Sequence, residues 1–134
     1  MMPGVVAGFP AKAPPAVIVI TTQYETPDYG GYDAGVLGAI TPPGSSAIPG
    51  AAAVVGAAGE ILRVIYERYE GFTHQMFVTV RGQFATVPFS SLAIDSQVVS
   101  GFSVYYADSS QTTFRTRSIS ENPIPAGTHA LVFG

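Results

Sequence analysis

Residues 97–119, QVVSGFSVYYADSSQTTFRTRSI, carry the clearest indication of the fold. Two runs rich in β-branched and aromatic residues, 97–107 and 112–119, flank the four residues DSSQ at 108–111, a common length for a hairpin loop. Because strand side chains alternate, the even-numbered residues of the second run should face one side of a sheet and the odd-numbered residues the other. The segment therefore predicts an antiparallel hairpin.

Similar runs on either side of this hairpin extend the β pattern. Residues 76–81 (MFVTVR) and 128–133 (THALVF) fit strands, with Gly82 and the sequence IPAG at 124–127 as turns beside them. Residues 16–22 (AVIVITT) are apolar on both faces, which predicts burial between two layers or against another subunit. Short strands separated by turn signals predict a mainly β fold, a single antiparallel β-sandwich or small barrel over residues 16–134.

Residues 60–70 (EILRVIYERYE) fit two secondary structures. As a helix, they would gather their apolar side chains on one face, opposite most of their charges. As a strand, Leu62, Val64 and Tyr66 would share one face. The β-branched and aromatic content, and the glycines at both borders, favour the strand.

Two segments are rich in residues that interrupt regular structure. Residues 1–15 contain four prolines, which predict an extended Pro-rich N-terminal arm. Residues 34–59 carry no charge and many Gly, Ala and Pro residues, so we expect mostly loop with short extended pieces. A membrane-spanning helix of about 20 residues would not tolerate these interruptions, so we expect no contact with a membrane.

The composition excludes several classes of protein and site. Six basic and nine acidic residues give a net charge of −3, and Lys12 is the only lysine, so a nucleic-acid binder with a basic patch is not expected. The absence of cysteine excludes disulfides and thiolate metal sites. Only 11% of the residues are charged, against about 25% in typical globular proteins. Such a charge-poor surface is typical of an interface, and identical subunits could cover it.

Residues 24–33 (YETPDYGGYD) contain the most site-like cluster of side chains. Aromatic rings can stack on a sugar, and carboxylates beside them can accept hydrogen bonds from its hydroxyl groups. We therefore expect that a ligand, if one binds, contacts a loop formed by these residues, with a glycan as the ligand class. The candidate ligand-binding residues are Tyr24, Asp28, Tyr29, Tyr32 and Asp33.

No recognised catalytic or metal-binding motif is present. His74 and His129 are far apart in the sequence, and a metal site would need a carboxylate such as Asp95 or Asp108 beside them, which the spacing does not predict. The nucleophile motif G-x-S-x-G and the phosphate-binding lysine motif are absent, and so is the calcium loop D-x-[DN]-x-[DN]-G. We expect no enzymatic activity, no metal and no cofactor.

The arm and the strand that follows it are the predicted assembly elements. An arm can order on a neighbouring subunit, and an exposed strand edge can pair with another chain. If residues 16–22 form such an edge, pairing would occur there. The candidate interface residues are Val5, Phe9, Val17 and Val19.

Several of these features together resemble the small structural proteins of tailed bacteriophage virions. They are the short β body, the arm sequence VVAGFPAKAPP at 5–15, the Gly/Ala/Pro-rich linker at 42–59, the absent cysteine and the single lysine, and they span the whole chain. The resemblance implies a capsid decoration or cement protein, or a small tail or fibre component, located in the virion. It also implies homo-oligomers that contact a larger viral shell or tail. The alternative function is a carbohydrate-binding β-sandwich module that uses the loop at 24–33.

Overall fold

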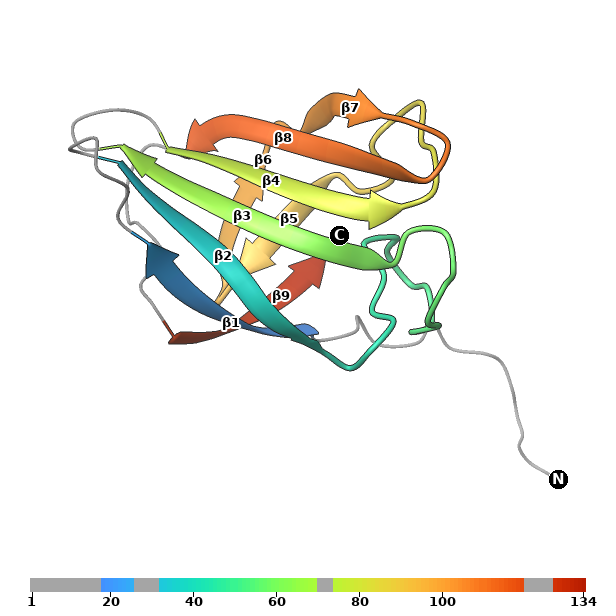
Figure 1. The fold of residues 1–134 in the computed structure, drawn as a ribbon, viewed down its shortest axis with the longest axis horizontal. Coiled ribbons are helices and arrows are strands. Elements are labelled where there is room, and N and C mark those ends of the chain that lie inside the picture. Colours follow the sequence, from blue (N-terminus) through green and yellow to red (C-terminus); the bar gives the residue numbers. More distant parts are fainter. Residues whose placement is uncertain (1–17, 26–31, 70–73, 120–126) are drawn as a thin grey trace, which may run out of the picture.

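The residues that the structure describes form nine antiparallel strands. The computed structural model describes residues 18–25, 32–69, 74–119 and 127–134, and this part of the chain contains no helix (Figure 1). The strands are β1 (Ile18–Glu25), β2 (Tyr32–Thr41), β3 (Ile61–Tyr69), β4 (His74–Arg81), β5 (Ser91–Ile94), β6 (Gln97–Ser100), β7 (Ser103–Ala107), β8 (Gln111–Ile119) and β9 (Gly127–Phe133). The prediction of a mainly β fold is confirmed. The predicted arm at residues 1–15 lies outside the described residues.

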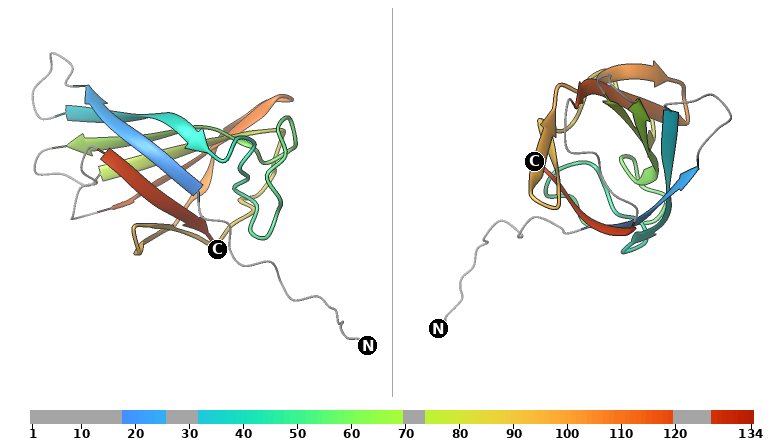
Figure 2. Two further views of the ribbon diagram at one scale, coloured as in Figure 1. Left: turned by 90° about the horizontal axis from the view of Figure 1, so that it is seen from below. Right: turned by 90° about the vertical axis from the view of Figure 1, so that its left-hand side faces the viewer.

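The strands form one continuous sheet that bends over on itself. Their order is β6-β5-β9-β1-β2-β3-β4-β8-β7, so most neighbours are also neighbours in sequence. The part formed by β6, β5 and β9 packs face to face with the part formed by β3, β4 and β8, as in a β-sandwich (Figures 1 and 2). The buried apolar residues of these strands are Ile61, Val64, Tyr66, Met76, Val78, Val80, Leu92, Ile94, Val99, Phe114, Leu131 and Phe133.

The run at residues 97–107 turns a corner between the two packed parts. The prediction of one continuous strand there was wrong, because the strand is interrupted at Gly101, which has a φ of +81°. The residues after this glycine pair with a different strand from those before it. Before the break β6 pairs with β5, and after it β7 pairs with β8. The hydroxyl of Thr116 on β8 donates a hydrogen bond of 2.8 Å to the carbonyl of Ser100. A bent strand that changes sheets is a common way to build such a corner, and glycine permits the bend.

The sidedness of β8 follows the predicted alternation where its side chains are described. Thr112, Phe114 and Thr116 are buried, whereas Thr113 and Arg115 are only partly buried on the other face. The buried hydroxyl of Thr112 donates to the carbonyl of Gly82 at 2.8 Å and accepts from the amide of Phe84 at 2.9 Å. These bonds satisfy a polar group that would otherwise be costly to bury.

Within the run at residues 60–70, Ile61–Tyr69 form the strand β3, as the β-branched content favoured, but the predicted face was partly wrong. Ile61, Val64 and Tyr66 are buried, and Leu62 is 36% exposed. The pairing of β3 with β4 shifts by one residue between Ile61 and Arg63. This bulge reverses the sidedness at the start of the strand, so Ile61 takes the core position expected for Leu62.

Two loop predictions also need correction. Residues 24–33 do not form one loop, because β1 continues through Glu25 and β2 begins at Tyr32. Of the segment at 34–59, expected to be mostly loop with short extended pieces, residues 34–41 lie in β2 and the loop begins at Pro42. Gly and Ala dominate this part of β2 and give no alternating pattern, whereas the flanking strands supply its hydrogen-bonding partners.

The loop at residues 42–60 packs against the ends of β3 and β4. Ala47 is fully buried and its amide donates to the carbonyl of Gly59 at 3.0 Å. One carboxylate oxygen of Glu60 accepts bonds from the amide of Gly56 and from Nε of Arg81, both at 2.9 Å. The loop therefore has a defined conformation despite its lack of regular structure.

Candidate binding face

The candidate ligand-binding residues are divided between strands and undescribed segments. Tyr24 lies in β1, opposite Gly35 of β2, while Tyr32 and Asp33 lie in β2 and pair with β3. Asp28 and Tyr29 lie outside the described residues. The backbone register thus corrects the predicted loop boundaries, and glycan binding by these residues stays a prediction.

The expectation that the first strand is a sheet edge was wrong. β1 lies between β9 and β2, so Val19 is opposite both Ala130 and Thr41. Pairing with another chain along this strand would have to displace one of those neighbours. Val19 is 36% exposed on its face of the sheet. The other candidate interface residues, Val5, Phe9 and Val17, lie outside the described part of the chain.

His129 and Asp95 form a hydrogen-bonded pair that attaches the β5–β6 turn to β9. His129 is 4% exposed, and its Nδ1 lies 2.5 Å from Oδ2 of Asp95. The other carboxylate oxygen accepts the amide of Ala130 at 2.9 Å. Hydrogen bonding from His129, and then from the Ala130 amide, lowers the pKa of Asp95 below its ordinary value. The described residues contain no group of three or more side chains that could hold a metal ion.

A surface that carries exposed tyrosine and arginine side chains lies on the outer face of β3, β4, β8 and β7. Cross-strand register places Ile65, Phe77 and Arg115 in one row across β3, β4 and β8. The next row contains Arg63 and the two threonines Thr79 and Thr113, whose hydroxyl oxygens lie 2.9 Å apart. Side chains in such rows contact one another directly, so the face presents an ordered set of groups.

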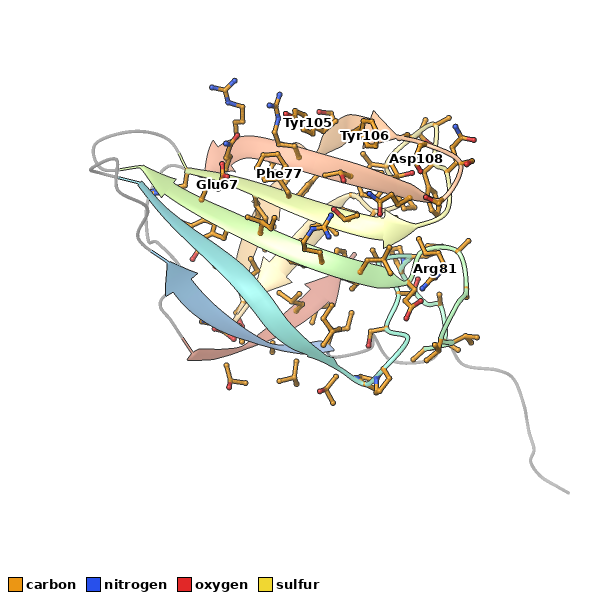
Figure 3. All side chains as sticks on the ribbon, in the orientation of Figure 1. Glu67, Phe77, Arg81, Tyr105, Tyr106 and Asp108 are labelled. Atoms are coloured by element: carbon orange, nitrogen blue, oxygen red, sulfur yellow. The ribbon has the colours of Figure 1, made fainter. Side chains whose placement is uncertain are left out.

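A bulge in β7 brings two consecutive tyrosines to this face. Val104 pairs with the buried Phe114, and Tyr106 pairs with Thr113, so Tyr105 is the extra residue between them. Neighbouring residues at a bulge can point to the same side of a sheet, unlike neighbours in a regular strand. Figure 3 shows Tyr105 and Tyr106 on β7, with Asp108 beyond the end of this strand and Arg81 apart from them.

Tyr105 has two close neighbours on the face. Its ring packs edge-on against Phe77 with a centroid separation of 5.3 Å. The guanidinium carbon of Arg115 lies 4.5 Å from the centroid of the same ring, a cation–π contact. Tyr105 and Tyr106 are nevertheless 55% and 53% exposed. Arg117 is exposed beside the buried Thr116, so its side chain also lies on the outer side of β8. We call this surface, which comprises Arg63, Phe77, Tyr105, Tyr106, Arg115 and Arg117, the tyrosine–arginine face.

Asp108 organises the hairpin beside this face. Its Oδ1 accepts hydrogen bonds from the amide and hydroxyl of Ser110, both at 2.8 Å, and from the amide of Gln111 at 2.9 Å. Its Oδ2 accepts the hydroxyl of Tyr106 at 3.1 Å. Hydrogen bonds from the Ser110 amide first, then from the Ser110 hydroxyl and the Gln111 amide, lower the pKa of Asp108 to about 2 from an ordinary 3.8. The same contact with Asp108 raises the pKa of Tyr106.

Asp108 should therefore contribute to acid sensitivity. Because its pKa is lower in the folded chain, its carboxylate stabilises the fold above its unfolded value of 3.8, and this contribution is lost as the pH falls toward about 2. We expect the melting temperature of the unchanged protein to fall more between these pH values than that of Asp108→Asn. Thermal unfolding followed by circular dichroism from pH 5 to pH 2 measures both slopes. Equal slopes would contradict the assigned role of the carboxylate.

Sequence reasoning missed the tyrosine–arginine face. The adjacent tyrosines at 105 and 106 were visible within the predicted strand, but regular alternation would place them on opposite sides. The chain matches no protein-family model, no curated protein and no solved structure. Within the described ranges, no helix is long and apolar enough to cross a membrane.

Proposed function

We propose that this chain is a non-enzymatic virion structural protein that acts through protein–protein contacts. Its place would be as a capsid decoration or cement protein, or as a small tail or fibre component. The observation that carries the proposal is the exposure of Tyr105 and Tyr106, each more than half exposed on the outer face of the sheet. Tyrosine and arginine are enriched where protein interfaces gain most of their binding energy.

The rest of the described surface supports the same function. Large apolar side chains are also exposed on the loop at residues 42–60, where Val54 and Val55 project, and on β6 at Val98. Only 11% of all residues are charged, so little of the surface is strongly hydrated. Subunit contacts would remove such groups from water. The virion setting rests on the resemblance carried by the arm sequence, the linker and the composition.

Removal of residues 1–15 tests the predicted contribution of the arm. The described strands begin at Ile18, so the deletion removes none of them. We expect the whole chain to form an oligomer and the shortened chain to associate more weakly, with an unchanged melting temperature. Size-exclusion chromatography with light scattering measures the mass of both.

A monomer in both forms would contradict the structural function. That result would favour the alternative of a carbohydrate-binding module. Retention on immobilised glycans, lost in Tyr29→Ala and Tyr32→Ala without a change in melting temperature, would then identify the predicted site.

A further inference from the structure

We propose that the tyrosine–arginine face binds an acidic surface on a second copy of this chain, in a head-to-tail contact. The inference rests on the proposed function, because it names a surface through which identical subunits would associate. Three observations carry it. Among the described residues the arginines of the face form no ion pair, and the carboxylates beside them already accept hydrogen bonds. The rest of the chain has a net negative charge.

The arginines of the face have charge available for a partner. Arg63 and Arg117 are exposed, and Arg115 is partly buried against the ring of Tyr105. In the part of the chain that the structure describes, none of the three forms an ion pair. A guanidinium has five N–H donors and can bind a carboxylate through two parallel hydrogen bonds.

The carboxylates near the face are already engaged by their own chain. Asp108 accepts hydrogen bonds at both oxygens, from Ser110, Gln111 and Tyr106. Oε1 of Glu67 accepts a hydrogen bond from the amide group of Gln75. The face therefore offers donors rather than acceptors, and the complementary surface is anionic.

The same contacts favour a protein partner over a sugar. A sugar stacks on a free aromatic face and donates its hydroxyl hydrogens to nearby carboxylates. Here Arg115 covers one side of the Tyr105 ring, and Asp108 already accepts four hydrogen bonds. Tyrosine and arginine side chains placed together are typical of the energetically important centre of a protein interface.

The remaining chain has the opposite charge. The face, counted together with the neighbouring Glu67 and Asp108, holds three of the six basic residues and two of the nine acidic residues. The rest of the sequence therefore has three basic and seven acidic residues. Two identical positive faces would repel each other, whereas one such face and an acidic surface of the next copy would attract. A head-to-tail contact of this kind builds rings or filaments.

Substitutions on the face test the contact in the whole chain. We expect Tyr105→Ala and Arg117→Gln each to weaken self-association by about tenfold or more, as loss of an important interface residue does. Arg81→Gln is the control for Arg117→Gln, because it removes an exposed arginine outside the face. Sedimentation velocity over a range of concentrations measures association, and the melting temperature of each variant reports its folding. Unchanged association of the folded Arg117→Gln variant would overturn the proposal even if Tyr105→Ala failed to fold.

A mixing experiment tests the head-to-tail arrangement. Fluorescently labelled Tyr105→Ala retains every carboxylate of the chain, so we expect it to join assemblies of the unchanged chain. In a symmetric contact that used this face on both copies, the variant would be excluded. Exclusion of the folded, labelled variant from the assemblies would therefore overturn the proposal.

The outcomes separate this inference from the proposed function. If the unchanged chain does not associate, both fail. If it associates and the face variants associate equally well, only the inference fails. Assembly should also weaken as the salt concentration rises from about 0.1 to 1 M, because the screening length falls from about 10 to 3 Å. Assembly that is insensitive to salt would overturn the acidic partner surface.

Discussion

Replacing Phe114 by alanine is expected to destabilise the fold by about 3 to 5 kcal/mol, the usual cost of removing a fully buried phenylalanine. Phe114 is 0% exposed, and its ring packs edge-on against Phe84 and Phe89 at centroid separations of 6.1 and 5.5 Å. Phe89 in turn contacts Phe102 and Phe133. Loss of the Phe114 ring would leave a cavity beside Phe84 and Phe89 in the core.

Urea denaturation of Phe114→Ala, compared with the unchanged protein, measures this cost. Val98→Ala is the matched control, because Val98 is 67% exposed and its substitution should change the free energy of unfolding by no more than about 0.5 kcal/mol. A cost below about 1 kcal/mol for Phe114→Ala would mean that the phenylalanine cluster does not form the core described here.

Gly44→Ala is expected to have a comparable effect through the backbone. Gly44 has a φ of +79°, and an added Cβ would lie 2.5 Å from the amide nitrogen of Val55 and 2.6 Å from the carbonyl carbon of Val54. The Val54 amide donates a hydrogen bond of 3.0 Å to the Gly44 carbonyl, which holds these two parts of the loop together. Because backbone atoms cannot move aside as a flexible side chain can, we expect a loss of about 3 kcal/mol or more.

Gly50 provides a control with the same backbone conformation. Its φ is +78°, but an added Cβ would meet no atom within 4 Å. Gly50→Ala should therefore cost only the conformational strain, about 1 to 2 kcal/mol. Urea denaturation gives the global cost, and faster exchange of the Val54 amide hydrogen would report opening of the loop alone. Equal effects of the two substitutions by both measurements would contradict the close approach at Gly44.

The sequence contained enough information to predict the class of fold. The alternation at residues 112–119 predicted which side chains of β8 face the core, and Phe114 lies there. The β-branched content of residues 60–70 favoured the strand that became β3. These predictions succeeded because each run is long enough for its local pattern to agree with its final environment.

The predictions failed where pairing partners, rather than local pattern, decide the structure. β5 has only four residues, and its identity as a strand depends on β6 and β9 beside it. The corner at Gly101 exists because the residues before and after it pair with different strands. Similarly, nothing within residues 16–22 indicates whether the strand lies at an edge or, as found, in the interior of the sheet.

Predicting the tyrosine–arginine face requires both the local sequence pattern and the pairing of the strands. Its residue types are visible in the sequence, but they come from four strands whose register sets their spacing. The bulge at Tyr105 moves one tyrosine from the expected side of β7 to the other. A one-residue irregularity of this kind reverses the direction of a side chain and cannot be read from alternation alone.

Sedimentation equilibrium of the unchanged chain tests the proposed structural function most directly. One subunit has a mass of 13.9 kDa, so each possible assembly has a distinct mass. We predict a concentration-dependent mass that reaches a multiple of the subunit mass larger than two. A mass equal to one subunit at every concentration would contradict the proposal that this chain functions through contacts with copies of itself.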